Sequence, residues 1–190
     1  MNKEGKLKKV THKGEKLEVD FYENFLEPEK AKLILDYIEE KIEWKKRMIY
    51  GKLYQVYGDF PSMLPWDDLP ILKAVRNHVK TVTGLDYNYC FVQKYKDGNR
   101  GISPHRDNEV LEHLSISGVS LGATRIFTVS PPSYIKAEKI NLTLNPGSLY
   151  VLKSPTNKHW LHSIEKDPNI KEPRISLTFR FAENEENSHK

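Results

Sequence analysis

The chain has 190 residues, of which 38% are hydrophobic and 29% are charged, and its formal net charge is +4. This length is typical of one domain, and the hydrophobic content is sufficient for a sizeable core. No apolar run approaches the about 18 residues of a membrane span, and the N-terminal stretch lacks the apolar segment of a secretory signal. A single cysteine, Cys90, excludes an internal disulfide. We therefore expect an intracellular monomer, in the cytoplasm or nucleus, that does not contact a membrane.

Charge is concentrated at both ends of the chain. Six lysines fall within the first sixteen residues, and the last eight residues, ENEENSHK, are mostly polar and acidic. We predict a flexible basic arm over residues 1–18, a single domain over residues 19–182 and a flexible tail over residues 183–190. A basic arm can attract phosphates by counterion release, or it can serve solubility alone. Both interpretations remain open.

Two segments have the periodicity of amphipathic helices. The first begins at Pro28, and its apolar positions are Leu33, Ile34, Tyr37, Ile38 and Ile42. The second begins near Asp68, ends before Gly84, and has its apolar positions at Leu72, Val75, Val79 and Val82. Between the two helices, RMIYGKLYQVYGDF lacks helical periodicity and favours short strands or a structured loop.

After Gly84 the sequence changes to short β-branched and aromatic runs separated by turn residues. These runs are NYCFVQKY, LSISGVSLG, TRIFTVS, KINLTL, SLYVLK, HWLHSIE and RISLTFRF. So many short strands predict an antiparallel sandwich, barrel or jelly roll. In the last run, the period of two places the polar side chains of Arg174, Ser176, Thr178 and Arg180 on one face. The opposite face carries Ile175, Leu177, Phe179 and Phe181.

The motif HRD contains a possible pair of metal ligands. His105 and Asp107 are two residues apart, so both side chains leave an extended backbone on the same side. A third ligand must come from another strand, and the candidates are His159 and His162. Because they are three residues apart, only one of them can face the metal ion if both lie on one strand. Two imidazoles and one carboxylate form the facial triad of non-haem Fe(II) sites, which leaves positions open for oxygen and a co-substrate.

Two arginines on one strand face indicate an anion. Arg174 and Arg180 would be costly inside a barrel unless a negative group meets them, because an unpaired buried charge is unfavourable. A dicarboxylate would satisfy them, since arginine binds carboxylates through two parallel hydrogen bonds. The alternative is an edge strand with both arginines in water.

Together, YKDG, HRDNE, SLGATRIF, GSLYVLKSPTNKHWLHSI and RISLTFR resemble the AlkB family of Fe(II)- and 2-oxoglutarate-dependent dioxygenases, in particular its animal nucleic-acid demethylases. The resemblance spans roughly residues 50–181 and keeps the family's order of motifs. It implies an α+β, mostly β fold, namely a double-stranded β-helix, or jelly roll, with flanking helices.

The resemblance also implies specific site residues. It assigns the iron ligands, which act in catalysis, to His105, Asp107 and His162, and leaves His159 as a packing neighbour. It assigns 2-oxoglutarate binding to Gln93, Tyr95, Arg174, Ser176, Thr178 and Arg180. The family's usual motif is R-x-N-x-T-x-R, so Ser176 departs from it, as does Gln93 where asparagine is common. Both replacements keep hydrogen-bonding ability.

For the substrate, the resemblance points to a flipped base. It places Tyr57 where an aromatic ring stacks on that base, and Asn108 and Glu109 where relatives contact its exocyclic amino group. Many relatives have two acids there, so Asn108 weakens the parallel. A core tyrosine is the simpler interpretation of Tyr57, and we assign Gly122 and Arg125 no site role.

The implied reaction is oxidative demethylation of 1-methyladenine and 3-methylcytosine in alkylated DNA or RNA. It consumes O2 and 2-oxoglutarate and releases formaldehyde, succinate and CO2. Only EWKKRMI occupies the stretch where duplex-repairing relatives have a probing hairpin, which favours single-stranded substrates. The alternatives are an oxygenase of protein or nucleotides, a catalytically inactive nucleic-acid binding module, and a non-redox cupin-like metalloprotein.

Overall fold

The computed structural model describes residues 7–12, 16–49, 52–57, 69–107, 115–134 and 136–181. Within these ranges the chain forms three helices and two antiparallel sheets, one of eight strands and one of four. The helices are α1 (Pro28–Lys41), α2 (Pro70–Thr83) and α3 (Ser154–His159). Among the described helices, none has both the length and the apolar character needed to cross a membrane.

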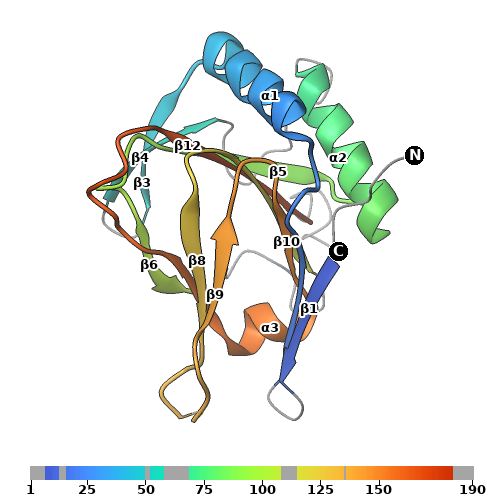
Figure 1. Cartoon of the computed structure of the whole chain (residues 1–190), viewed down its shortest axis with the longest axis vertical. Coiled ribbons are helices and arrows are strands. Elements are labelled where there is room, and N and C mark those ends of the chain that lie inside the picture. Colours follow the sequence, from blue (N-terminus) through green and yellow to red (C-terminus); the bar gives the residue numbers. More distant parts are fainter. Residues whose placement is uncertain are drawn as a thin grey trace, which may run out of the picture.

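The two sheets face each other, and α1 and α2 lie side by side on the outer face of the larger one (Figure 1). In spatial order, the larger sheet consists of β1 (Leu7–His12), β2 (Leu17–Tyr22), β10 (Leu149–Leu152), β7 (Ile116–Gly122), β12 (Arg174–Arg180), β5 (Tyr89–Tyr95), β4 (Lys52–Tyr57) and β3 (Lys45–Ile49). The smaller sheet consists of β6 (Ile102–His105), β11 (Leu161–Ile164), β8 (Arg125–Ser130) and β9 (Ile140–Leu144). All seven predicted strands after Gly84 are present.

Two hydrophobic clusters hold these layers together. One lies between the larger sheet and the two helices, and the other fills the space between the sheets. Strand β12 contributes Ile175, Leu177 and Phe179 to the helix side. Its other face buries Arg174, whose side chain therefore enters the space between the sheets. The alternation predicted for this strand is confirmed, and it directs polar groups into the barrel.

The two predicted helices are present with small differences. Helix α1 begins with Pro28 in its first turn, but Leu33 is 67% exposed, so our placement of this residue on the core face is wrong. The buried face is formed by Ala31, Ile34 and Ile38, which follow the helical spacing more closely. Helix α2 ends at Gly84, which adopts the left-handed conformation with φ of 75° that glycine tolerates best.

The N-terminal part differs from the predicted flexible arm. Residues 7–12 form β1, which pairs with β2, and β2 in turn pairs with β10. The physical reason lies in β2, at the end of the predicted arm. Its apolar residues Leu17, Val19 and Phe21 alternate with more exposed residues and are buried between the sheets. The edge of β2 is then available to pair with residues 7–12. The first six residues and the tail from residue 182 onward lie outside the described residues.

A β-hairpin lies between the two helices α1 and α2 in the sequence. Strands β3 and β4 pair antiparallel with Lys45 opposite Val56, and β4 joins β5 at the edge of the larger sheet. Our expectation that EWKKRMI would be only a short connection is therefore wrong. Three residues of β4, 55–57, pair with β5, and the rest of the hairpin extends past that pairing. Tyr50 and Gly51 lie outside the described residues.

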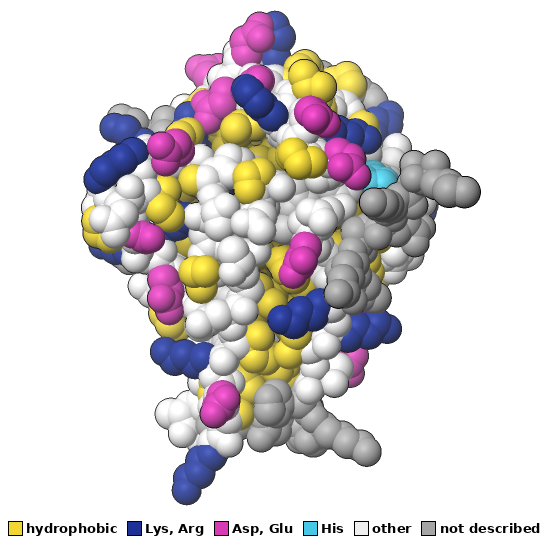
Figure 2. Space-filling view, in the orientation of Figure 1, with side chains coloured by type: hydrophobic (Ala, Val, Ile, Leu, Met, Phe, Trp, Pro, Cys, Tyr) yellow, Lys and Arg dark blue, Asp and Glu magenta, His cyan; other side chains and the backbone are white. Residues whose placement is uncertain are grey.

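The face of the molecule in Figure 2 has mixed character. Lys and Arg side chains are interspersed with Asp and Glu side chains, so the described residues form no large basic surface on this face. Hydrophobic side chains are visible between β9 and β1, where the cluster between the sheets approaches the surface. Val10 of β1 and Ile140 of β9 pack against that cluster.

Candidate metal centre

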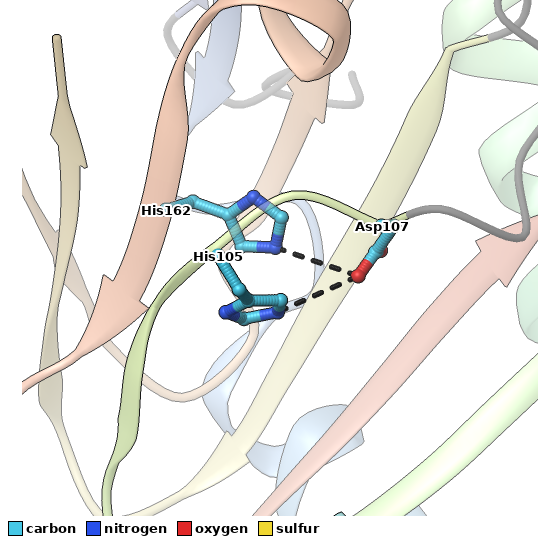
Figure 3. Close-up of side chains that lie close together, drawn as sticks. All are labelled: His105, Asp107 and His162. Atoms are coloured by element: carbon cyan, nitrogen blue, oxygen red, sulfur yellow. Dashed lines mark ion pairs between the residues drawn. The ribbon is translucent and has the colours of Figure 1, made fainter. Parts of the chain in front are cut away.

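Strand pairing brings the predicted metal ligands together. His105 is the last residue of β6, and it lies directly opposite His162 on β11. Asp107 follows two residues after His105, where the chain has left the strand and turns its carboxylate toward both rings (Figure 3). The site is therefore assembled from two neighbouring strands of the smaller sheet.

The distances fit a single metal ion. Asp107 Oδ1 lies 3.4 Å from His105 Nε2 and 3.8 Å from His162 Nε2. One ligand atom from each of the three residues falls within 4.8 Å of the other two. Two imidazole nitrogens and one carboxylate oxygen are a suitable ligand set for non-haem Fe(II).

The two histidine rings are held with Nε2 toward Asp107. His105 Nδ1 lies 2.8 Å from the carbonyl oxygen of Ser103, and this contact orients the ring so that Nε2 faces the carboxylate. For His162, burial lowers the pKa to about 4, and the neighbouring His105 and Arg180 act in the same direction against the opposing effect of Asp107. A neutral ring is the form that a metal ion binds.

The carboxylate of Asp107 is kept ionised. Burial by itself would raise the pKa of Asp107, but Arg180 and the two histidines outweigh it and hold that pKa well below its usual range. Arg180 Nη2 lies 2.7 Å from Asp107 Oδ2, and the carboxylate is almost fully buried. This places Arg180 at the metal end of the site, which differs from our expectation that both arginines face the far carboxylate of the co-substrate.

The backbone of Asp107 is held by a residue that the sequence analysis did not identify. Asn157 Nδ2 donates to the carbonyl oxygen of Asp107 at 3.0 Å, and Asn157 Oδ1 accepts from its amide at 3.2 Å. The neighbouring Thr156 exchanges two 2.7 Å hydrogen bonds with the backbone of Glu18 on β2. Helix α3 therefore links the metal loop to the N-terminal strands, and no local motif signals this connection.

The secondary structure favours His162 over His159 as the third ligand. Pro155 lies in the first turn of α3, and this helix ends at His159, so the predicted strand begins only at Leu161. Among the described residues, the only group of three possible ligands includes His162 and not His159. The resemblance-based assignment of His162 agrees with this geometry.

Buried polar side chains of β12 and β5 form a polar pocket lining between the sheets, on the strand whose Arg180 contacts Asp107. Arg174 is 1% exposed, and its Nε donates to Ser120 Oγ at 2.9 Å while its Nη2 lies 3.4 Å from Ser176 Oγ. Tyr95 donates its hydroxyl to Gln93 Oε1 at 3.2 Å. Burial raises the pKa of Tyr95, against the opposing effect of the arginines, so the phenol keeps its proton.

Two buried donor atoms in this pocket remain without a partner among the described residues. They are Arg174 Nη1 and Gln93 Nε2. A buried donor left unsatisfied is unfavourable, so the pocket is suited to an acceptor from outside the chain. A carboxylate of 2-oxoglutarate fits this requirement. The hydroxyls of Ser176 and Thr178, 3.4 Å apart, continue the polar face toward Arg180.

Arg125, to which we assigned no site role from the sequence, is buried inside the barrel. This side chain is 2% exposed, and it shares a face of β8 with Phe127 and Val129, which belong to the cluster between the sheets. The sequence could have predicted that Arg125 is buried. The period of two along TRIFTVS places Arg125 on the same side of the strand as the apolar Phe127 and Val129.

The structure describes only the backbone of one predicted substrate residue. The backbone of Tyr57 lies in β4, opposite Val92 of β5, and its side chain lies outside the described part of the structure. Asn108 and Glu109 lie outside the described residues. The stacking role of Tyr57 and the contacts of Asn108 and Glu109 stay predictions.

Comparisons with known proteins agree with the fold and with the family resemblance. Residues 54–180 match the model of the 2OG-Fe(II) oxygenase superfamily. DNA oxidative demethylase ALKBH2 of Homo sapiens is 36% identical over 149 residues, which cover 72% of this chain and 56% of that protein. The Mus musculus protein of the same name is 32% identical, with 88% and 81% of the two chains covered. Alpha-ketoglutarate-dependent dioxygenase alkB homolog 3 of Homo sapiens is 28% identical, with 85% and 65% covered.

A solved structure, that of OsALKBH1, has the same fold. It superposes with a TM-score of 0.60 at 14% identity and covers 93% of this chain and 100% of its own. The chain spans 56% and 52% of the length of the Homo sapiens and Bos taurus ALKBH2 proteins that it matches. The family match covers most of the chain and includes both strands that carry the metal ligands. This protein therefore belongs to the 2OG-Fe(II) oxygenase superfamily and, within it, to the AlkB family.

Proposed function

We propose that this chain removes methyl groups oxidatively from 1-methyladenine and 3-methylcytosine in single-stranded DNA or RNA. The observation that carries the proposal is the group of His105, Asp107 and His162, together with the buried, unsatisfied donors on Arg174 and Gln93. It is supported by 36% identity to a protein named as a DNA oxidative demethylase.

The residues of the chain have distinct tasks in this reaction. His105, Asp107 and His162 hold Fe(II), and Arg180 keeps Asp107 ionised. Arg174, with Tyr95, binds the far carboxylate of 2-oxoglutarate and so orients its keto acid end toward the metal. When bound, the iron and co-substrate use O2 to hydroxylate the methyl group, giving succinate and CO2, and the product then loses formaldehyde.

The preference for single strands is supported by the small size of the β3–β4 hairpin. Its strands have five and six residues, and residues 55–57 of β4 are paired with β5. A hairpin of this size offers few residues that could be inserted into a duplex. Flipping a base out of a duplex costs a few kcal/mol for unstacking and unpairing, which a single strand spares.

We also infer that one copy of the chain is sufficient and that it works inside the cell, in the cytoplasm or nucleus. All three metal ligands and the polar pocket come from a single chain. The one cysteine, Cys90, is buried and reduced, which is compatible with a reducing compartment.

The experiment compares methylated single-stranded and duplex DNA and RNA oligonucleotides, incubated with Fe(II), 2-oxoglutarate and O2 at matched salt. We expect formaldehyde and succinate in equal amounts, faster from single strands, and none from the Asp107→Ala variant. Demethylation fastest in the duplex would contradict the strand preference. Succinate formation stimulated only by peptides or free nucleotides would assign the site to another substrate, and nucleic-acid binding without succinate would identify an inactive binding module.

A further inference from the structure

Arg125 is a buried arginine at the first position of β8. Its side chain leaves the strand on the same side as Phe127, which is stacked on Tyr150 between the two sheets. The guanidinium therefore lies in the interior, although β8 belongs to the smaller sheet and Arg174 to the larger one. Neither the metal ligands nor the proposed co-substrate contacts account for a charge at this position.

Hydrogen bonds fix the guanidinium of Arg125 in place. Its Nη2 donates to the carbonyl oxygen of Arg100 at 2.7 Å and to that of Glu165. Arg100 lies in the loop after β5, and Glu165 follows β11. These two loops are joined by backbone hydrogen bonds of 2.9 Å from Gly98 to Ile170 and from Asp167 to Gly98. Carbonyl groups orient Arg125, but they do not neutralise its charge.

Arg125 and Arg174 approach the same tyrosine. The Cζ atom of Arg125 lies 5.8 Å from the centre of the Tyr95 ring, and that of Arg174 lies 5.1 Å from it. Among the described residues, neither guanidinium has an ion pair with a carboxylate. Burial lowers the pKa of both arginines. For Arg125 the charge of Arg174 acts in the same direction, and the effects of Tyr95, Asp167 and Asp97 on this pKa oppose it without reversing it. A buried charge without an ion pair is unfavourable.

We propose that Arg125 is a positioning and specificity residue, which supplies a second positive charge behind Tyr95 and so makes the pocket select co-substrates with a second carboxylate. It acts through Tyr95 and through the electrostatic potential of the pocket, without touching the co-substrate. The inference rests on the proposed function only in that 2-oxoglutarate occupies the pocket beside Arg174. A unit charge at roughly 8 Å and an effective dielectric constant of about 20 changes the affinity for an anion by more than about tenfold.

The test measures binding without nucleic acid, so it is independent of demethylation. The affinities of 2-oxoglutarate and of 2-oxopentanoate, which lacks the far carboxylate, are measured by calorimetry with Mn(II) in place of Fe(II). The variants are Arg125→Gln, which can still donate to a carbonyl but has no charge, and Arg125→Lys, which keeps the charge. Arg100→Met is the matched control, because the Arg100 side chain is exposed and its backbone carbonyl remains.

We expect Arg125→Gln to lower the preference for 2-oxoglutarate over 2-oxopentanoate by about tenfold. Arg125→Lys and Arg100→Met should keep that preference within about threefold of the original, because both retain the buried charge. In turnover with an active substrate, Arg125→Gln should raise the KM for 2-oxoglutarate more than it lowers kcat.

Two results would overturn the proposal. One is an unchanged preference in Arg125→Gln, and the other is an equal loss of affinity for both keto acids, which indicates a purely structural role. If Arg125→Gln does not fold, Arg125→Lys still decides, since a tenfold fall in preference with the charge retained contradicts an electrostatic role. Failure of the demethylase assay alone would leave this binding result standing.

Discussion

Arg180 is paired with Asp107, with 2.7 Å between Nη2 and Oδ2, whereas Arg174, six residues earlier on the same strand face, has no carboxylate partner among the described residues. The two arginines of β12 are thus divided between two tasks. One stabilises the charge of a metal ligand, and the other offers a free donor to a co-substrate. This division leads to opposite expectations for their replacement.

Arg180→Leu should destabilise the metal-free protein, and Arg174→Leu should instead weaken co-substrate binding. Without Arg180, the buried carboxylate of Asp107 loses its closest cation, and truncating one partner of such a pair costs about 2 to 5 kcal/mol. A bound metal ion would take the place of that cation, so Fe(II) should restore most of the lost stability. Arg174→Leu should raise the 2-oxoglutarate requirement. Denaturant unfolding with and without metal and co-substrate titration check the two variants, and equal effects of both variants on both measurements would contradict the division.

His162→Ala should abolish metal binding and turnover, while His159→Ala should keep a measurable fraction of both. The reason is that His162 is buried on β11 beside Asp107, whereas His159 ends α3 and is only partly buried. Metal content and succinate formation are the measurements, and circular dichroism confirms folding. If the two folded variants lost metal equally, the third ligand would have to be reassigned.

Gly118→Ala should destabilise the protein through a clash with Tyr150. A Cβ at position 118 would overlap the Tyr150 ring, which lies directly across from it on β10 and is held against Phe127. Overpacking of this kind costs about 1 to 3 kcal/mol. Denaturant unfolding should show this loss for Gly118→Ala. In a protein that already carries Tyr150→Leu, the ring is gone, so adding Gly118→Ala should lower the unfolding free energy by less. If the losses of the two single variants simply add in the double variant, the clash is not the cause.

Alkaline pH should destabilise the protein in part through Tyr150. Burial raises the pKa of Tyr150 to about 12, while a tyrosine in the unfolded chain titrates near about 10. The stability contributed by the buried phenol is therefore fully present below about pH 10 and is lost as the pH rises toward about 12. Tyr150→Phe should reduce the fall in unfolding free energy between pH 9 and pH 11 by about 1 kcal/mol. An identical fall in both proteins would show that Tyr150 does not take part.

Tyr57→Ala should slow demethylation of a methylated oligonucleotide without affecting 2-oxoglutarate binding. Loss of a stacking ring weakens base binding by about 1 to 3 kcal/mol. The comparison of KM for oligonucleotide and for co-substrate separates this from a general loss of structure. Tyr57→Phe is the control, since it keeps the stacking surface. Unchanged oligonucleotide kinetics in Tyr57→Ala would favour the simpler interpretation of a core tyrosine.

The strands of the barrel were predictable because their side chains alternate over several residues. RISLTFRF is the best example, since its parity alone placed Arg174 and Ile175 on opposite faces, while the family resemblance favoured the inward direction for the arginine. His105 and Asp107 were predictable as a pair for the same reason. Their relation to His162 depends on the pairing of β6 with β11, which no local pattern contains and which the family resemblance supplied.

Other features depend on contacts between distant segments. Strand β1 is short and rich in lysine, so its sequence by itself resembles a solvated tail. It forms a strand because it pairs with β2, and this pairing is not visible in its own residues. The support of Asp107 by Asn157 joins residues 50 positions apart through a side-chain amide. Leu33 has the right residue type for a core and lies one step off the buried stripe of α1.

The position of β12 in the larger sheet has a consequence for biosynthesis. This strand comes last along the described chain, yet it lies between β7 and β5, near the middle of the strand order. A nascent chain that ends before residue 174 lacks the strand that joins the two halves of that sheet, and it also lacks Arg174 and Arg180. Because nonlocal strand pairing is slow and unpaired edges favour aggregation, we expect the barrel to close only after residues 174–180 have left the ribosome. Until then, the exposed edges of β7 and β5 are the surfaces that a chaperone has to protect.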